Sequence, residues 1–203
     1  MSRETTLSAL DVSRETTDRL DAYVELLLKW NRRINLIGRS TTDDIWTRHV
    51  LDCAQLVEHV PAKPHSWIDL GSGAGLPGIV VAILNPNSAV TLVEADQRKA
   101  TFLRAATSTL GLSAEIEDRR IEAIPPTPYD IISARALAPL PRLLELAAPF
   151  RGDHTRCLFP KGRQVHSELT AARADWHIEA ITLPSRSDAD GTLLAIDRFE
   201  ARA

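Results

Sequence analysis

Glycine is concentrated in one short segment of the chain. Four of the nine glycines, Gly71, Gly73, Gly75 and Gly78, stand within eight residues. Glycine allows a tight turn and lets the backbone approach a ligand closely, and Pro77 suits the first turn of a following helix because its missing N–H needs no partner there. The segment therefore predicts a ligand-binding loop between a strand and a helix.

The residue before this loop narrows the choice of ligand. Residues 73–78 satisfy the dinucleotide fingerprint GxGxxG, but the glycine run begins two residues too early for that fold, and Asp69 precedes it. A carboxylate there would repel a pyrophosphate, whereas it can hold the cationic amino acid end of S-adenosylmethionine, directly or through water. The pattern of apolar residues, Asp69 and glycines resembles the first motif of Rossmann-like methyltransferases.

Further candidate binding residues follow the other expected strands. Glu94 ends the next strand, 23 residues after Gly71, close to the spacing at which a carboxylate binds ribose hydroxyl groups. Ile121 and Glu122 follow the third strand, where an apolar residue and an acid can meet an adenine ring and its amino group. Arg135 follows the fourth strand, at the carboxyl edge where open α/β sheets bind ligands.

These residues need a sheet to bring them together, and the chain from Trp67 onward has the pattern of one. Short apolar runs alternate with helical patterns, which is typical of βαβ units and a parallel sheet. Residues 178–183 and 193–199 are strand-like and joined by a connection too short for a crossover helix, so they should pair antiparallel. We expect the other strands at 67–70, 90–94, 114–117, 129–133 and 156–160, and helices near 78–84, 97–110, 140–148 and 164–174.

The first 60 residues are expected to form a helical N-terminal extension, and residues 61–203 the core of one compact unit. Apolar residues spaced at i, i+3, i+4, i+7 and i+8 from Leu20 predict a helix from near Thr17 to Asn31. A second helix is expected to begin at Thr41 or Thr42 and to end before Pro61.

The overall composition excludes several classes of protein. The chain of 203 residues, 44% hydrophobic and 25% charged, is sized for one globular domain and is neither disordered nor fibrous. A net charge of −3 argues against general coating of nucleic acid, which needs an excess of Lys and Arg. Cys53 and Cys157 have no metal-ligand spacing, so no metal is expected. The first residues lack the apolar stretch of a signal peptide and no run of apolar residues reaches membrane length, so we expect a cytoplasmic monomer that does not associate with membranes.

Basic residues are nevertheless clustered in one N-terminal segment and near predicted strand ends. Residues 29–39 hold four basic residues and no acid. Arg98, Arg120 and Lys161 fall near predicted strand ends, where they can contact the phosphates of a folded RNA, although any single one is also explained as part of a solvated surface. His49 is interpreted as a hydrogen-bonded structural histidine rather than a base.

Five pieces of the sequence, in this order, resemble the bacterial 16S rRNA (guanine-N7)-methyltransferase family, also called glucose-inhibited division protein B. They are NRRINL (31–36), RHVLD (48–52), DLGSGAGLPG (69–78), SARA (133–136) and PKG (160–162), and they span roughly residues 25–165. The chain has one residue, Ala134, between Ser133 and Arg135, where the family commonly has Ser-Arg.

The resemblance implies an α/β, Rossmann-like methyltransferase that uses S-adenosyl-L-methionine and acts on one guanine of 16S rRNA in the small ribosomal subunit, giving 7-methylguanosine. Because N7 of guanine carries an available lone pair, alignment suffices and we name no catalytic base. The resemblance also implies RNA contacts by Arg98, Arg120 and Lys161. It implies cofactor contacts by Gly71, Gly73, Leu76, Glu94, Ile121, Glu122 and Arg135.

Three other interpretations are weighed against this one. A methyltransferase for a small molecule would use the same loop and close the N-terminal helices as a lid, and the spread of basic residues favours RNA over it. An NAD-linked oxidoreductase is disfavoured by Asp69 and by the register of the glycines. A nucleic-acid-binding module without enzymatic activity is disfavoured by the sequence pI of about 6.1.

Overall fold

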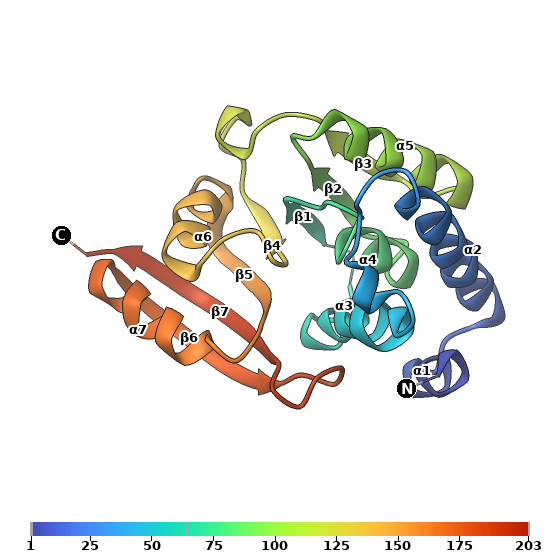
Figure 1. Ribbon diagram of the computed structural model, residues 1–203. Coiled ribbons are helices and arrows are strands. Elements are labelled where there is room, and N and C mark those ends of the chain that lie inside the picture. The colour runs from blue at the N-terminus through green and yellow to red at the C-terminus, as the bar shows by residue number, and fades with distance from the viewer. Residues whose placement is uncertain (1, 64, 203) are drawn as a thin grey trace.

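The computed structural model describes residues 2–63 and 65–202, and a seven-stranded sheet forms its centre (Figure 1). Strands β1 to β5 pair in parallel, and β7 pairs antiparallel with both β5 and β6 in the order β3-β2-β1-β4-β5-β7-β6. The predicted fold class, a mostly parallel α/β sheet with a C-terminal antiparallel hairpin, is confirmed. The strands are β1 (Ser66–Leu70), β2 (Ala89–Val93), β3 (Ala114–Glu117), β4 (Tyr129–Ser133), β5 (Arg151–Lys161), β6 (Trp176–Pro184) and β7 (Thr192–Ala201).

Helices cover both faces of the sheet. The longer ones are α1 (Arg3–Leu10), α2 (Arg14–Asn31), α4 (Gly78–Leu84), α5 (Gln97–Leu110), α6 (Leu140–Ala147) and α7 (Val165–Asp175). The short helical segments are η1 (Arg39–Thr41), η2 (Trp46–Leu51), α3 (Asp52–Ala54), η3 (Gln55–His59), η4 (Ile121–Ala123) and η5 (Ala148–Phe150). Apart from the N-terminal part, these helices lie within a residue or two of the predicted positions.

The predicted helix from Thr41 or Thr42 is wrong at its start. The segment first makes the short turn η1, and the helical stretch then begins with the π-helical η2 and continues through α3 and η3 to His59. The two threonine hydroxyl groups donate to Gly38 O and Arg39 O in the preceding turn, so they do not cap the helix that follows.

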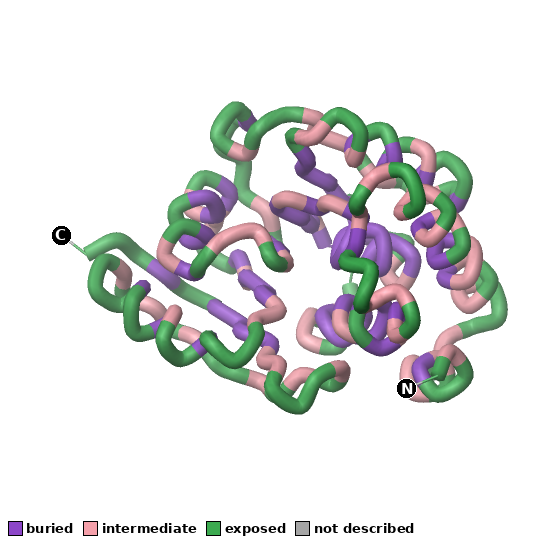
Figure 2. The backbone as a smooth tube through the Cα atoms, in the orientation of Figure 1, coloured by how far each residue is buried: buried purple, intermediate pink, exposed green. Residues whose placement is uncertain are grey.

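Two apolar clusters lie on opposite faces of the sheet. One includes residues of α2, α4 and α5 with Trp67 and Leu92, and the other includes residues of α6 and α7 with Ile68 and Val93. Adjacent residues of a strand point to opposite faces, so β1 and β2 are buried on both sides, as central parallel strands are (Figure 2). None of the helices that the structure describes is long and apolar enough to cross a membrane.

The N-terminal helices pack against the sheet domain and reach its glycine loop. Leu20 and Leu27 of α2 are fully buried in the same cluster as Val80 of α4. The buried Tyr23 hydroxyl donates to Ala74 O in the glycine loop at 2.8 Å. Helix α2 therefore helps to fix the loop.

Candidate functional site

The predicted binding residues come together because of the order of the strands. From β1 the chain builds β2 and β3 on one side and then crosses back to build β4 and β5 on the other. In such sheets a crevice opens at the carboxyl ends of the strands where the order reverses. Gly71 follows β1, Glu94 follows β2, and Arg135 lies two residues after β4, so all three stand at this edge.

Asp69 supports the glycine loop through hydrogen bonds of its buried side chain. Its side chain is fully buried, Oδ2 accepts from Gly78 N–H at 3.1 Å, and Oδ1 accepts from the Ser133 hydroxyl at 2.7 Å. The expected contact of Asp69 with the amino acid end of a cofactor, directly or through water, stays a prediction; the side chain itself binds the loop backbone and lines neither of the two cavities at this edge of the sheet. The acid at the end of β1 identifies the loop in the sequence, and in the structure its hydrogen bonds hold the backbone of that loop in place.

Burial also changes the ionisation of Asp69. Removal from water raises its pKa from 3.8 to about 6, and the hydrogen bonds from Ser133, Ser72 and Gly78 oppose the rise. Ser133 itself accepts from the buried Trp67 indole N–H at 2.9 Å. The chain Trp67, Ser133, Asp69, Gly78 thus joins β1 and β4 to the start of α4.

The raised pKa of Asp69 makes the stability depend on pH. The folded protein binds this proton more tightly than the unfolded chain does. The difference contributes about 3 kcal/mol to the free energy of unfolding; this contribution is complete below pH 3.8 and is lost as the pH rises through about 6. The free energy of unfolding of the parent, relative to that of Asp69→Asn, should therefore fall between about pH 4 and about pH 7 in urea titrations. A difference that stays constant or rises would contradict this assignment.

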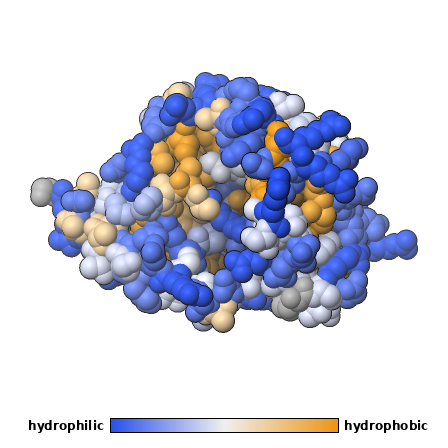
Figure 3. Space-filling model, viewed as in Figure 1, coloured by the Kyte–Doolittle hydropathy of each residue, from blue (hydrophilic) through white to orange (hydrophobic). Residues whose placement is uncertain are grey.

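A cavity of about 460 Å³ opens beside the glycine loop, and we call it the loop cavity. Gly71 and Gly73 line it from the loop after β1, Glu94 from the end of β2, and Ile121 and Glu122 from η4. Apolar surface gathers on this face between α6 and the end of β1 (Figure 3). Five of the seven predicted cofactor contacts thus line one cavity, which the spacing of the motifs predicts.

Glu94 is the most constrained of these residues. Its side chain is buried, Oε2 accepts from Gly73 N–H at 2.9 Å, and Oε1 accepts from Asp96 N–H at 2.7 Å. Two backbone donors therefore hold the carboxylate in place, and its remaining lone pairs are available to hydroxyl groups in the cavity.

Glu122 lies on the opposite wall and is paired. Its carboxylate contacts Arg142 Nη2 at 2.5 Å, and Arg142 also bonds Glu145. Arg142 lines the loop cavity too, although sequence reasoning missed it. Its position in the first turns of α6 carries no motif, so only the fold reveals it.

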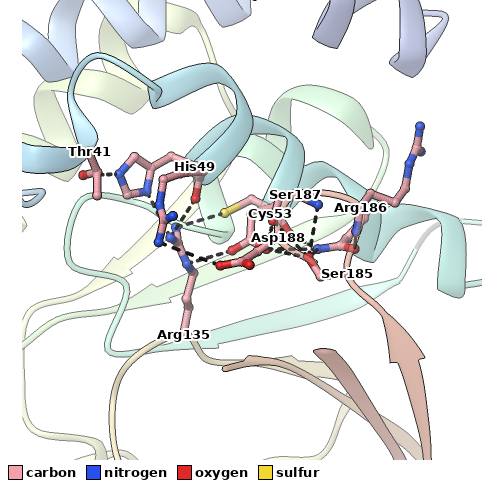
Figure 4. Close-up of polar contacts among 11 residues, drawn as sticks. Thr41, His49, Cys53, Arg135, Ser185, Arg186, Ser187 and Asp188 are labelled. Carbon is pink, nitrogen blue, oxygen red and sulfur yellow. Dashed lines mark hydrogen bonds and ion pairs between the residues drawn. The ribbon is translucent and has the colours of Figure 1, made fainter. Parts of the chain in front are cut away.

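Leu76 and Arg135 do not line the loop cavity. Leu76 is buried in the apolar cluster with α2 and α4. Arg135 turns toward the N-terminal segment, where Nε contacts Asp52 Oδ2 at 3.0 Å and Nη2 donates to Arg48 O at 2.9 Å (Figure 4). The motif gave the position of Arg135 at the strand end, but not the direction of its side chain.

His49 completes the surroundings of Arg135. Its Nδ1 lies 3.0 Å from Arg135 Nη2, and its Nε2 lies 2.8 Å from Thr41 Oγ1. Burial and then the charge of Arg135 lower the pKa of His49 from 6.5 to about 4. The ring is therefore neutral at physiological pH, accepting from Arg135 and donating to Thr41, which agrees with the structural role expected for it.

A second cavity of about 550 Å³ adjoins the first, and we call it the adjacent cavity. Residues 136–138 line both cavities and form the wall between them. Arg135, Asp52 and Lys161 line the adjacent cavity, together with residues of the loop between β6 and β7. Sequence reasoning did not anticipate this contribution of the β6–β7 loop.

The three predicted RNA contacts differ in exposure. The Arg98 side chain is 76% exposed beside Asp96, and Arg120 is exposed at the mouth of the loop cavity. Lys161 is only 9% exposed: its Nζ contacts Glu168 at 2.7 Å and donates to Ala138 O at 3.1 Å. Lys161 therefore lines the adjacent cavity, paired with Glu168, and its predicted contact with RNA stays a prediction.

Solved structures share this fold at low sequence identity. The ribosomal protein L11 methylase from Lactobacillus delbrueckii subsp. bulgaricus aligns with a TM-score of 0.60 and 17% identity over 80% of each chain. A mutant of MtNAS in complex with S-adenosylmethionine aligns with a TM-score of 0.59 and 15% identity over 97% of this chain and 84% of that chain. At these identities the likeness concerns the fold alone.

Several curated proteins have a much higher sequence identity to this chain than these solved structures have. "Ribosomal RNA small subunit methyltransferase G" of Cereibacter sphaeroides is 55% identical over 200 residues, which cover 97% of each protein. The protein of that name from Rhodospirillum centenum is 49% identical over 195 residues, 96% of this chain and 90% of that one. Residues 16–189 match the family described as "GidB: rRNA small subunit methyltransferase G". The resemblance inferred from the five motifs is thereby confirmed, and the chain belongs to the rRNA small subunit methyltransferase G family.

Proposed function

We propose that the protein transfers the methyl group of S-adenosylmethionine to N7 of one guanine in the 16S rRNA of the small ribosomal subunit. The observation that carries this proposal is the loop cavity, which lies where the strand order reverses in a chain of this family and has the Glu94 carboxylate fixed inside it. Its volume of about 460 Å³ lies in the usual range for a cofactor pocket.

The residues of the loop cavity suit each part of that cofactor. Glu94 is positioned to accept from ribose hydroxyl groups, and Ile121 and Glu122 to meet the adenine ring and its amino group. Gly71 must lack a side chain, because a Cβ there would lie 2.6 Å from Leu137 Cδ1, and its φ is +67°. Gly73 also has a positive φ, +57°, and borders the cavity with its backbone. We assign Leu76 and Arg135 supporting positions beside the cavity.

The reaction needs positioning more than proton transfer. When bound, the cofactor supplies an electrophilic methyl group on a positively charged sulfur. N7 of neutral guanine offers an in-plane lone pair, so we assign no catalytic base; the chain's task is to align N7 with the methyl group. Because N7 lies in the deep major groove of an RNA helix, the target base must be in a loop or be unstacked.

Arg98 and Arg120 are the RNA contacts that the geometry supports, since both are exposed at the carboxyl edge of the sheet. Arg120→Ala should weaken rRNA binding and lower the slope of log K against log salt concentration by about 1, because one phosphate contact is lost. Filter binding at several salt concentrations measures this slope. Arg198→Ala on β7, where Arg198 pairs with Glu200, is the matched control; equal slopes for the two variants would contradict the contact.

We also propose that residues 1–60 serve as a helical extension of the core formed by 61–203, and that the protein acts as a cytoplasmic monomer without a metal cofactor. The apolar cluster shared by α2 and α4 supports the first point. The lone pair on N7 supports the last, because methyl transfer to it requires no Lewis acid.

Label transfer tests the proposed function. The purified protein is incubated with methyl-labelled S-adenosylmethionine and undermethylated 16S rRNA, either free or assembled in small subunits, and in parallel with a metabolite extract. Label in 16S rRNA is expected. Label in the metabolite fraction and none in rRNA would establish a small-molecule methyltransferase instead.

A further inference from the structure

The adjacent cavity is assembled from segments far apart in the sequence. Residues 135–139 after β4, residues 160–162 at the end of β5, and the β6–β7 loop surround it, and Asp52 of α3 closes it. Leu137, Pro139 and Pro160 supply apolar surface. The cavity is therefore separated from the loop cavity by a single segment, residues 136–138. A methyl acceptor must lie next to the methyl donor, so this cavity is suited to hold one.

The charged groups of the adjacent cavity are already paired with one another. Arg135 contacts Asp52 at 3.0 Å, Lys161 contacts Glu168 at 2.7 Å, and Arg48 lies 3.9 Å from Asp188. Each cation thus has an acid as its neighbour, and an anionic ligand would compete with these acids. A neutral ligand with hydrogen-bond donors and a flat apolar surface fits the cavity better than a phosphate does.

Asp52 is the most firmly held acid in this cavity. Oδ1 accepts from the Ser187 hydroxyl at 2.6 Å and from Gln55 Nε2 at 3.1 Å, while Oδ2 contacts Arg135 Nε (Figure 4). Its side chain is 14% exposed and lines the cavity. The carboxylate is therefore fixed in direction before any ligand arrives. Its Oδ1 is already occupied, with Ser185 Oγ also 3.4 Å away, so Oδ2 is the oxygen that can accept from a ligand.

The β6–β7 loop is tied to the N-terminal segment at the same place. Ser187 bonds Asp52, Arg186 N–H donates to Gln55 Oε1 at 3.0 Å, and the Arg186 guanidinium pairs with Glu58. These contacts join residues about 130 positions apart in the chain. They hold the wall of the cavity that lies beside Asp52.

The chemistry of guanine suits a fixed carboxylate. As the bond from N7 to the methyl carbon forms and the sulfur–methyl bond breaks, positive charge passes from sulfur to the base, and its N1–H becomes a stronger donor. A carboxylate that accepts from N1–H and the 2-amino group binds this charged base more tightly than the neutral one, which lowers the barrier. Flipped bases are commonly read on this edge.

We propose that the adjacent cavity receives the target guanine, with N7 toward the wall of residues 136–138 and with N1–H and the 2-amino group both donating to Asp52 Oδ2. The proposal rests on the proposed function and names its acceptor site. Adenine is rejected, because its N1 is an acceptor and would face the carboxylate. Ser187 and Arg135 act as positioning residues for Asp52.

A base-analogue experiment tests the assignment of Asp52. Small-subunit RNA is joined from two pieces so that the target position carries guanosine or inosine, which lacks the 2-amino group, and is assembled into subunits. For the parent protein, inosine should lower the single-turnover methylation rate about 10- to 100-fold, the usual effect of losing a hydrogen bond to a charged group. Asp52→Ala, which leaves no acceptor at this position, should be slower on guanosine by a similar factor and should no longer distinguish the two bases.

The ratio of the two rates does not depend on how much of a variant folds, so it isolates the contact with the base. Ser187→Ala should reduce this ratio in part. Asp190→Asn, which alters an exposed acid of the same loop paired with Arg163, should keep the parent's ratio. All variants should bind S-adenosylmethionine as the parent does, as measured by calorimetry. Discrimination that persists in Asp52→Ala would overturn the proposal while leaving the proposed function intact, whereas a parent that labels neither RNA would overturn both.

Discussion

Glu94→Ala should weaken the binding of S-adenosylmethionine by about 10- to 100-fold, the range expected when hydrogen bonds to a charged group are lost. The variant loses the carboxylate assigned to the ribose hydroxyl groups. It also frees Gly73 N–H and Asp96 N–H, which Glu94 holds at 2.9 and 2.7 Å. Both losses act on the same cavity. Isothermal titration calorimetry measures the dissociation constant directly.

Two further variants sharpen this result. Glu94→Gln keeps the size of the side chain and one acceptor oxygen, so its affinity should lie between those of the parent and Glu94→Ala. Glu115→Ala removes an exposed acid on β3 and should bind like the parent. If Glu94→Ala bound the cofactor as tightly as Glu115→Ala, the assignment of the loop cavity would be wrong.

Gly75→Ala should cause a large loss of stability. Gly75 has a φ of +82°, and a Cβ there would lie 2.5 Å from Ile79 Cδ1 and 3.0 Å from Ile79 Cβ in the first turn of α4. A side chain at positive φ costs about 1 to 2 kcal/mol and overpacking about 1 to 3 kcal/mol. Together they should lower Tm by about 10 °C in a domain of this size.

Gly162→Ala is the matched control for stability. Among the described residues nothing lies within 4 Å of a Cβ built at Gly162, and its φ is not in the positive range. This variant should melt within about 2 °C of the parent, since surface changes usually stay within about 0.5 kcal/mol. Equal melting temperatures for the two variants would contradict the packing described for the glycine loop.

Much of the fold could be predicted from local pattern. Buried parallel strands correspond to short apolar runs in the sequence, so the ends of β1 to β4 were predicted to within one residue. For β5 only the apolar second half was predicted. The glycine cluster fixed the place of the loop, and the strand that follows fixed Glu94. These features depend on neighbours in sequence, which is why they are visible without a structure.

The direction of long side chains could not be predicted in the same way. Arg135 and Lys161 both follow strands as expected, yet each turns toward an acid from a distant segment, Asp52 and Glu168. Asp52 belongs to a motif, but its contact with Ser187 depends on a loop 135 residues away. Such pairings are decided by tertiary packing, and no spacing rule in one sequence encodes them.

The acidic balance of the chain also has a clearer meaning in the structure. Asp69 and Glu94 are buried and support the glycine loop, and Asp52 and Glu168 neutralise cations inside the adjacent cavity. These acids therefore do not add to an exposed acidic surface that would repel RNA phosphates, while Arg98 and Arg120 remain exposed. A net charge of −3 is consistent with an enzyme that binds one folded RNA site.

Mass mapping of 16S rRNA from cells that lack the gene tests the central claim most directly. RNA from these cells is digested and compared with RNA from the parent strain and from cells that carry the gene on a plasmid. The account predicts that one guanosine loses one methyl group in the deletion strain, and that the parent gene restores 7-methylguanosine while Glu94→Ala restores it poorly. Identical methylation of 16S rRNA with and without the gene would contradict it.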